Sequence, residues 1–448
     1  MATLFRPRTL ILFLGDLFFF AFALWLSLLI RYSELPSWGF FELHLEPFAY
    51  LFAVWVAVYF IAGLYEGRLT ILARRALSST LLIAQIVNMA LAAIFFFVLP
   101  FGIAPKTILL IYLLVSFPLI LIWRAVMFPR LGLAKQERAI VVGAGPEVEL
   151  LSEVLSHSPF APVRVAAAVR PNGTPVASEV AQALKAHEAR FIIADFNTSA
   201  VVHAFPHMYN LLQEGVRFFD ALELYEQVLG RVPLSVLDDR WFARNVSRYA
   251  HMLYDGVKRL MDIVVASVFG LASLIVYPFI IAALKIQDGG EVIISMPRVG
   301  ENGEVFNLYK FRSMTGNDKA AYGAEGASAL TVTPVGAFLR VTRLDEIPQI
   351  WNVLKGDLSL IGPRPEAPTL VDLYQKEIPY YGVRHLVKPG LSGWAQLYHD
   401  NHPHHSADIE ATREKLSYDL YYLKHRSVTL DAIIILKTIK KLLTRSGV

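Results

Sequence analysis

The sequence of 448 residues has no cysteine. Disulfides, thiolate metal sites and cysteine nucleophiles are therefore excluded together. Charged side chains are also scarce, at 18% of residues, whereas hydrophobic residues account for 55% and the mean hydropathy is +0.46. An average soluble protein is less apolar, so the sequence predicts a membrane protein whose chemistry uses oxygen, imidazole or amine groups.

The net charge is +4 and the isoelectric point is about 9.0, a balance that is compatible with nucleic-acid binding. The basic residues, however, lie largely at the ends of apolar runs. That placement indicates contact with lipid headgroups. We therefore expect membrane lipids, and no nucleic acid, among the partners.

Residues 1–135 are predicted to form a bundle of four transmembrane helices. Four apolar runs of about 18 to 22 residues are each long enough to cross a hydrocarbon core of about 30 Å. They are Thr9–Ile30, Pro47–Leu64, Thr80–Leu99 and Thr107–Phe128. The first run is too long for a signal-peptide core and no small-residue cleavage site follows it, so we expect it to remain as an anchor.

The charges around these runs predict their orientation. The loop after the first run is acidic, and basic residues flank the opposite ends of the runs, at Arg6, Arg8, Arg68, Arg74, Arg75, Arg124, Arg130 and Lys135. The positive-inside rule then places both ends of the bundle in the cytoplasm. Asp16, Gln85 and Asn88 lie inside the runs, where we expect them to face other helices rather than to form an ion pathway.

Residues 136–245 are predicted to form a Rossmann-like α/β domain. The stretch "RAIVVGAGPEVELLSEVL" is typical of a buried strand, a glycine turn and a helix, and "RVAAAV" and "RFIIADF" are typical of further strands. Gly143 and Gly145 begin a dinucleotide fingerprint, but Val148 occupies its third glycine position. We therefore expect the turn geometry without the nucleotide. The polar segment 239–249 is predicted to be a linker.

The third section, 250–448, opens with 22 uncharged residues between Asp262 and Lys285. This stretch is long enough to span a membrane, but Pro278 interrupts it, and proline kinks or breaks a helix. A fifth span would place the rest of the chain outside the cell, whereas a re-entrant helix over 262–285 would keep it in the cytoplasm. The residues by themselves leave both interpretations open.

The last helical pattern is amphipathic and basic. One face carries Lys437, Lys441 and Arg445, and another face carries Val428, Ala432, Ile435, Ile439 and Leu442. Such a helix is suited to the surface of an anionic leaflet, and the lysine-rich end favours that interpretation. Ordinary packing on a protein core would give the same pattern.

The stretch "RLDEIPQIWNVLKGDLSLIGPRPE", residues 343–366, concentrates groups that could do chemistry. Pro348 fits the first turn of a helix and Gly356 favours its end, so a helix is predicted over about 346–355. Asp345 and Glu346 would then lie at its N-terminus, where the helix dipole favours anions. Arg364, framed by two prolines, would be held in an extended conformation.

Several cations accompany the two carboxylates, and they are Lys310, Arg312, Arg340, Arg343, Arg364, Arg384 and Lys388. Lys310 and Arg312 are predicted to share one face of a strand. Each cation alone is typical of a solvated surface, whereas the set favours a site for a polyanionic substrate and a divalent metal. A histidine-rich stretch has no partnering cysteines and favours a loop over a metal site; its histidines are His399, His402, His404 and His405.

The motifs of this section resemble those of the bacterial sugar transferase family, the monotopic polyprenyl-phosphate phosphoglycosyl transferases. They are "KRLMDIVVA", "PRVGENGEVFNLYKFRSM", "LRVTRLDEIPQIWNVLKGDLSLIGPRPE", "HLVKPGLSGWAQL" and "YDLYYLKHRS". With the four runs, the α/β domain and "LYEQVLGRVPL" at 224–234, the whole chain is similar to the long members that start exopolysaccharide, capsule or O-antigen assembly.

The resemblance implies a multi-pass protein of the bacterial inner membrane with a mainly α/β catalytic domain at 250–448 on the cytoplasmic face. It also implies a re-entrant helix broken at Pro278. Two departures from the family pattern are local: Tyr277 stands where the family commonly has serine, and Pro297 replaces a commonly polar residue while Arg298 is kept.

The resemblance further implies the roles of residues. Asp345 would attack the β-phosphate of a UDP-hexose, release UMP and carry a phosphosugar that undecaprenyl phosphate then accepts. Glu346 would hold Mg²⁺. The phosphates would be bound by Lys310, Arg312, Arg340, Arg364 and Arg384. The long form resembles glucose and galactose transferases most, and the sequence leaves the sugar open.

Two alternatives belong to other classes of protein. A membrane-anchored nucleotide-sugar dehydratase or epimerase would need a second glycine-rich fingerprint and a Tyr-x-x-x-Lys base in the last section, and the sequence has no convincing pair. A non-catalytic scaffold for polysaccharide assembly would give no reason for Asp345, Glu346 and Arg364 to occur together. A homodimer is compatible with the spans and the middle domain but is not required by them.

Overall fold

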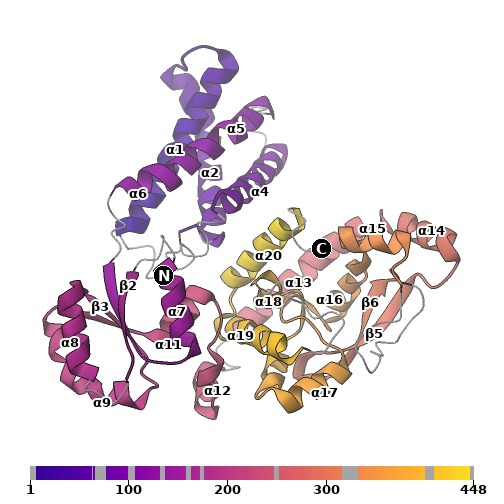
Figure 1. Cartoon of the computed structure of the whole chain (residues 1–448). Helices are drawn as coiled ribbons and strands as arrows, with labels where there is room; N and C mark the ends of the chain where they lie inside the picture. The colour runs from indigo at the N-terminus through magenta and orange to yellow at the C-terminus, as the bar shows by residue number, and fades with distance from the viewer. Residues whose placement is uncertain are drawn as a thin grey trace. The chain divides into compact units, whose positions relative to one another are not determined.

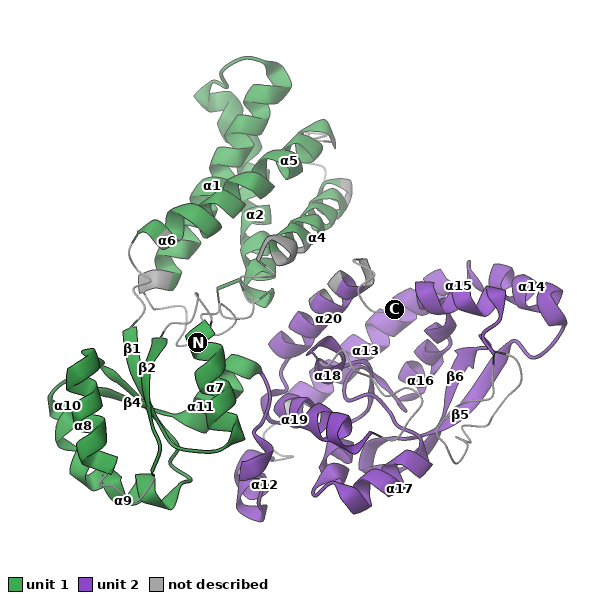
Figure 2. Cartoon of the chain, in the orientation of Figure 1, with its two compact units in different colours: residues 1–229 green, residues 230–448 purple. Residues whose placement is uncertain are grey.

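The structure is a computed structural model that describes residues 7–62, 64–65, 77–98, 106–131, 137–157, 163–171, 176–246, 252–314, 331–398 and 408–443. The chain divides into two compact units, 1–229 and 230–448 (Figure 1 and Figure 2). The predicted histidine loop lies outside the described residues.

The first unit begins with long apolar helices. They are α1 (Pro7–Tyr32), α2 (Trp38–Ile61), α4 (Leu77–Val98) and α5 (Lys106–Ile122), followed by a π-helical turn, η1 (Trp123–Met127), and by α6 (Phe128–Arg130). Three stretches are long and apolar enough to cross a membrane, namely Thr9–Tyr32, Trp38–Ile61 and Thr107–Met127, and α4 contains a shorter apolar stretch, Ala84–Phe96. The prediction of a membrane protein is confirmed at this level.

Polar side chains inside these helices face neighbouring helices, as expected. Asp16 accepts hydrogen bonds from Tyr65 Oη at 2.6 Å and from Arg124 Nε at 3.0 Å, and Gln85 Nε2 donates to Ser116 Oγ at 2.8 Å. Asp16 and Arg124 are both buried. The charge of Arg124 is therefore balanced within the first unit by Asp16, and its buried side chain does not reach lipid headgroups, contrary to the expectation for basic residues at the ends of the apolar runs.

Residues 137–229 form a four-stranded parallel sheet, in the order β2-β1-β3-β4, with helices on both faces. Because successive strand residues point to opposite faces, Ala139 and Val141 pack against α7 and α11, whereas Ile140 and Val142 pack against α8 and α9. The elements are β1 (Glu137–Val142), α7 (Pro146–His157), β2 (Val163–Val169), α8 (Val176–His187), β3 (Phe191–Ala194), α9 (Ser199–Met208), α10 (Asn210–Gln213), β4 (Arg217–Asp220) and α11 (Ala221–Leu229).

The predicted strand, glycine turn and helix are present at β1 and α7. Gly143 has a φ of 151°, and a Cβ at this position would lie 2.9 Å from Cβ of Asp195. Val148 is buried in the core between α7 and the sheet. Close packing on β3 therefore accounts for the glycine at this turn.

The second unit contains two small sheets surrounded by helices. Strands β5 and β6 are antiparallel, and β7 and β8 are parallel. The elements are η2 (Leu234–Val236), α12 (Asp239–Asn245), α13 (Met252–Ser273), α14 (Tyr277–Asp288), β5 (Ile293–Val299), η4 (Glu301–Gly303), β6 (Val305–Phe311), α15 (Pro334–Thr342), η5 (Leu344–Glu346), α16 (Gln349–Lys355), β7 (Ser359–Ile361), α17 (Pro368–Glu377), η6 (Tyr381–Leu386), β8 (Gly390–Ser392), α18 (Trp394–Tyr398), α19 (Ile409–His425) and α20 (Val428–Leu443).

The segment predicted as a linker is partly helical and packed. Trp241 of α12 is buried in one core with Val232, Tyr374 and Leu420. The indole therefore fixes α12 to the second unit, where the sequence suggested only a polar connection. The side of the C-terminal helix α20 that carries Ile434 is likewise packed on the core of this unit.

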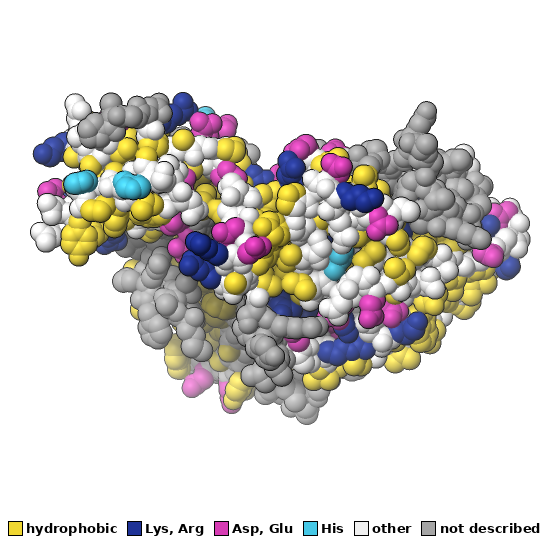
Figure 3. Space-filling model, turned by 90° about the horizontal axis from the view of Figure 1, so that it is seen from below, with side chains coloured by type: hydrophobic (Ala, Val, Ile, Leu, Met, Phe, Trp, Pro, Cys, Tyr) yellow, Lys and Arg dark blue, Asp and Glu magenta, His cyan; other side chains and the backbone are white. Residues whose placement is uncertain are grey.

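Helices α13 and α14 are bent by 57° relative to each other. Pro278 lies in the first turn of α14, where no helical hydrogen bond needs the missing N–H. The two helices expose many large apolar side chains, and hydrophobic side chains gather toward the end of the molecule where α14 lies (Figure 3). The most exposed are Leu260, Val268, Phe269, Leu271, Ile275, Phe279 and Ile286.

Candidate functional site

Asp345 lies in the 3₁₀ turn η5, between α15 and α16. Arg343, two residues earlier, has a φ of 58° and reverses the chain after α15. The helix predicted from about residue 346 begins instead at Gln349, because η5 precedes it. Asp345 is only 7% exposed, and within the described part of the chain its Oδ1 has no hydrogen-bond partner. Burial raises the pKa of Asp345 above its ordinary value, against the lowering effect of Lys310.

Glu346 lies among three cations. Its Oε1 is 3.1 Å from Lys310 Nζ, 3.5 Å from Arg364 Nη2 and 3.9 Å from Arg343 Nη1. Burial alone would raise the pKa of Glu346, but Lys310 and Arg364 outweigh it and lower the pKa to about 2. The two adjacent carboxylates therefore have opposite environments, and three of the cations singled out in the sequence converge on one of them.

Asn352 fixes the helix α16 to the strand that carries Lys310. Its Oδ1 accepts a hydrogen bond from Tyr309 N at 3.1 Å, and its Nδ2 donates to Asn307 O at 2.7 Å. Asn352 is fully buried. Sequence reasoning missed this residue, although an amide side chain in a short apolar helix is a signal of a buried polar contact.

Arg384 supports the backbone of Arg364. Its guanidinium donates to Arg364 O at 2.9 Å and lies 2.8 Å from Asp419 Oδ2. Arg384 is buried. Burial alone would lower the pKa of Arg384, but the neighbouring acidic groups outweigh this effect and raise the pKa above its ordinary value. The structure thus places Arg384 behind the site, with its charge already balanced, rather than among the groups that face Glu346.

Glu366 continues the same buried charge network. It accepts a hydrogen bond from Lys415 Nζ and lies 4.0 Å from Arg384 Nη1. Burial would raise the pKa of Glu366, but Lys415 and Arg384 lower it to about 2. Lys415 and Asp419 are four residues apart on α19, so both reach the same side of the helix. Two opposite charges four residues apart are visible in the sequence, and this pattern could have indicated that Lys415 and Asp419 lie on one side of the helix.

The remaining predicted phosphate-binding residues lie apart from Glu346. Arg312 forms an ion pair with Asp288, at the end of α14. Arg340, in the last turn of α15, is exposed, and its Nη1 lies 3.5 Å from Met314 Sδ. Arg340 is nevertheless close enough to Asp345 to lower the pKa of that carboxyl. Lys310 and Arg312 therefore have different partners, although Lys310 lies on β6 and Arg312 directly follows that strand.

Fold and site together define a membrane protein in which a buried carboxylate stands beside a carboxylate held by three cations. The positive charges of such a cluster are already in place to bind an anionic group. Residues 253–445 match the family model of the bacterial sugar transferases.

Named relatives agree with this match. An N-acetylgalactosaminephosphotransferase acting with UDP-N-acetylgalactosamine and undecaprenyl phosphate, from Aeromonas hydrophila, is 41% identical over 50% of this chain and 52% of its own. A UDP-glucose:undecaprenyl-phosphate glucose-1-phosphate transferase of Escherichia coli (strain K12) is 39% identical over 42% of each chain. The uncharacterized sugar transferase EpsL of Bacillus subtilis (strain 168) is 34% identical over 43% of this chain and 90% of its own.

The chain belongs to the bacterial sugar transferase family. The resemblance inferred from its motifs is thereby confirmed. The match covers about half or less of the Aeromonas and Escherichia proteins.

Proposed function

We propose that this protein transfers a hexose 1-phosphate from a UDP-hexose to undecaprenyl phosphate. The names of its relatives give the class of donor and acceptor. The observation that carries the proposal is the convergence of Lys310, Arg343 and Arg364 on Glu346, next to the buried Asp345. A diphosphate needs such cations, and a carboxylate is a competent nucleophile toward phosphorus once the cations neutralise the charge of the diphosphate.

In the proposed first step, a carboxylate oxygen of Asp345 attacks the β-phosphorus of the UDP-hexose. The bond from this phosphorus to the bridging oxygen breaks, and UMP leaves with that oxygen. In the second step, a phosphate oxygen of undecaprenyl phosphate attacks the same phosphorus, and the Asp345 carboxylate is released unchanged. The sequence of steps needs no oxidant or reductant, and it lets a soluble donor leave before a lipid acceptor arrives.

We propose that Glu346, with Asp345, holds Mg²⁺ together with substrate phosphates. Mg²⁺ usually takes one or two protein carboxylates and completes its coordination with phosphates and water. The two carboxylates fit that pattern, and the buried Oδ1 of Asp345 has an open lone pair as far as the described residues go. No group of three or more acidic or histidine side chains suited to a metal occurs among those residues. When bound, the ion supplies charge neutralisation to the diphosphate.

The finer architecture is also proposed. The helices α1, α2, α4 and α5 would form the four-span bundle, and the parallel sheet with its helices would be a Rossmann-like domain. The bent pair α13 and α14 would re-enter the membrane from the cytoplasmic face. A break beside Pro278 and the exposed apolar side chains of both helices support that arrangement. The dehydratase and scaffold alternatives have no comparable support.

The test is UMP release from a panel of UDP-hexoses by the detergent-solubilised full chain with undecaprenyl phosphate and Mg²⁺. We expect lipid-dependent release from one hexose, and a loss of about 10³-fold or more in Asp345→Asn, because the amide is no nucleophile. Asp372→Asn makes the same change on an exposed face of α17 and should match the parent. Equal activity in Asp345→Asn would remove the nucleophile assignment, and inactivity with every donor would favour the scaffold.

A further inference from the structure

The helix α13 lies along α16, the helix that follows the two carboxylates. Ala266 of α13 and Val353 of α16 share one core. Further along α13, a Cβ at Gly270 would lie 3.4 Å from Cγ2 of Ile350 in the first turn of α16. The two helices are therefore antiparallel, and the later, apolar part of α13 reaches the end of α16 that adjoins Asp345.

Arg259 fixes the other end of this contact. Its Nη1 donates to Val353 O at 2.7 Å, and its Nη2 donates to Leu354 O at 2.8 Å. These carbonyls belong to the last turn of α16, where a helix has unpaired acceptors and its dipole favours a cation. The planar guanidinium meets both acceptors at once, which a flexible ammonium does not do. Arg259 thus sets the position of α13 along α16.

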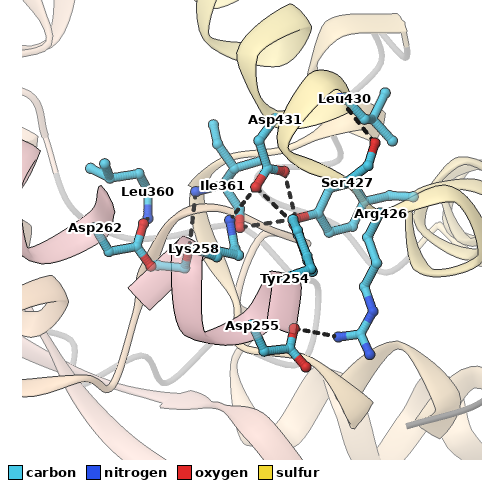
Figure 4. A network of polar contacts seen from close by, with 12 residues as sticks. Tyr254, Asp255, Lys258, Asp262, Leu360, Ile361, Arg426, Ser427, Leu430 and Asp431 are labelled. Atoms are coloured by element: carbon cyan, nitrogen blue, oxygen red, sulfur yellow. Dashed lines mark hydrogen bonds and ion pairs between the residues drawn. The ribbon is translucent and has the colours of Figure 1, made fainter. Parts of the chain in front are cut away.

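Three other side chains of α13 hold the helix to further elements (Figure 4). Tyr254 Oη and Lys258 Nζ donate to Asp431 of α20 at 2.7 and 2.8 Å. Asp262 accepts a hydrogen bond from Leu360 N of β7 at 3.0 Å. Because these three residues of α13 recur every four positions, they line one face of the helix. The first half of α13 is therefore bonded to α16, α20 and β7 at once.

We propose that Arg259 is a positioning residue for the lipid step of the reaction, an inference that rests on the proposed function. It holds α13 in register on α16, so that the membrane-inserted part of α13 presents the lipid phosphate at Asp345. A slip of one residue moves a helix by about 1.5 Å, and a misplacement of about 1 Å can lower a rate by roughly 10²-fold. None of the residues proposed to bind the diphosphate lies on α13, so the UDP-hexose step should tolerate such a slip.

The experiment separates the two half-reactions in the full chain. Exchange of labelled UMP into UDP-hexose without lipid reports the first step, and lipid-dependent UMP release reports both. For Arg259→Met we expect exchange within about 2-fold of the parent, at least a 10-fold loss of lipid-dependent release, and a raised KM for undecaprenyl phosphate. Arg259→Lys keeps the positive charge and one donor group, so its lipid-dependent release should lie between that of the parent and that of Arg259→Met.

Arg413→Met is the matched control, because Arg413 is partly exposed and pairs with Glu410 on the surface of α19. In Arg413→Met, the rates of UMP exchange and of lipid-dependent UMP release should equal those of the parent. A parallel fall of exchange and release in Arg259→Lys, or an unchanged lipid-dependent rate in both Arg259 variants, would overturn the positioning role. A parent that neither exchanges nor releases UMP contradicts the proposed function itself. Release without exchange contradicts only the covalent step, and the KM for the lipid then decides the role of Arg259.

Discussion

At the scale of the residue, the two carboxylates at the centre of the site differ by environment rather than by chemistry. Asp345 is buried, its Oδ1 has no hydrogen-bond partner among the described residues, and burial raises its pKa, whereas Glu346 is held by Lys310 and Arg364 with a pKa of about 2. A carboxylate already saturated by cations is a poor nucleophile. This difference favours Asp345 over Glu346 as the proposed nucleophile.

Removing Asp419 should destabilise the second unit. Asp419→Ala leaves the buried guanidinium of Arg384 without its nearest counter-charge, and breaking such a pair costs about 3–5 kcal/mol. We expect a fall of several degrees in the unfolding temperature of the detergent-solubilised protein. UMP release should fall as well, because the backbone of Arg364 loses its support.

The control is Arg413→Ala, which breaks the exposed ion pair with Glu410 on the same helix. Exposed pairs contribute about 0–1 kcal/mol, so its unfolding temperature should stay within a degree or two of the parent. Equal unfolding temperatures in Asp419→Ala and Arg413→Ala would show that the Arg384 network is not a structural support.

At the scale of the element, the contact between α16 and β6 depends on the side-chain amide of Asn352. Asn352→Ala removes the side chain that pairs with Tyr309 N and Asn307 O of β6 in a partly buried place, at a cost of about 0.5–1.5 kcal/mol for each hydrogen bond. The strand would then shift relative to α16, and Lys310 would leave Glu346. We expect a lower unfolding temperature together with a raised KM for the UDP-hexose, measured by UMP release.

Asn245→Ala serves as its control. Asn245 makes a single hydrogen bond to Trp241 O on α12, so its removal should cost about 1 kcal/mol and leave the KM unchanged. A KM equal to that of the parent in Asn352→Ala would mean that Lys310 does not depend on the contact between α16 and β6.

At the scale of the whole molecule, the absence of native cysteine allows a clean test of topology. Single cysteines at Glu34 and Lys376, which are both exposed, would report the loop after α1 and the second unit. A membrane-impermeant maleimide should label Glu34→Cys in intact spheroplasts. Lys376→Cys should be labelled only after permeabilisation, because a re-entrant α13 and α14 return the chain to the cytoplasm.

Labelling of Lys376→Cys in intact spheroplasts would show instead that the bent pair spans the membrane. The sequence left this choice open because 22 uncharged residues suit either path. The bend of 57° removes the simplest spanning form, a straight helix.

The sequence by itself determined the membrane character, the strand–turn–helix at Gly143 and the family, because each depends on local patterns of apolar residues or on contiguous motifs. It also singled out Asp345, Glu346 and Arg364, which lie within 22 residues of one another. A short distance along the chain limits how far apart such groups can lie, so their assembly follows nearly from the sequence.

Only the tertiary structure decided the partner of each cation. Lys310 meets Glu346, Arg312 meets Asp288 and Arg384 meets a carboxylate 35 residues away on α19. Arg259 reaches carbonyls more than 90 residues away. A basic residue has the same appearance in a sequence whichever acceptor it finds, and the acceptor is fixed by how remote helices and strands pack. The cations that face Glu346 could therefore be separated from those that pair elsewhere only in the fold.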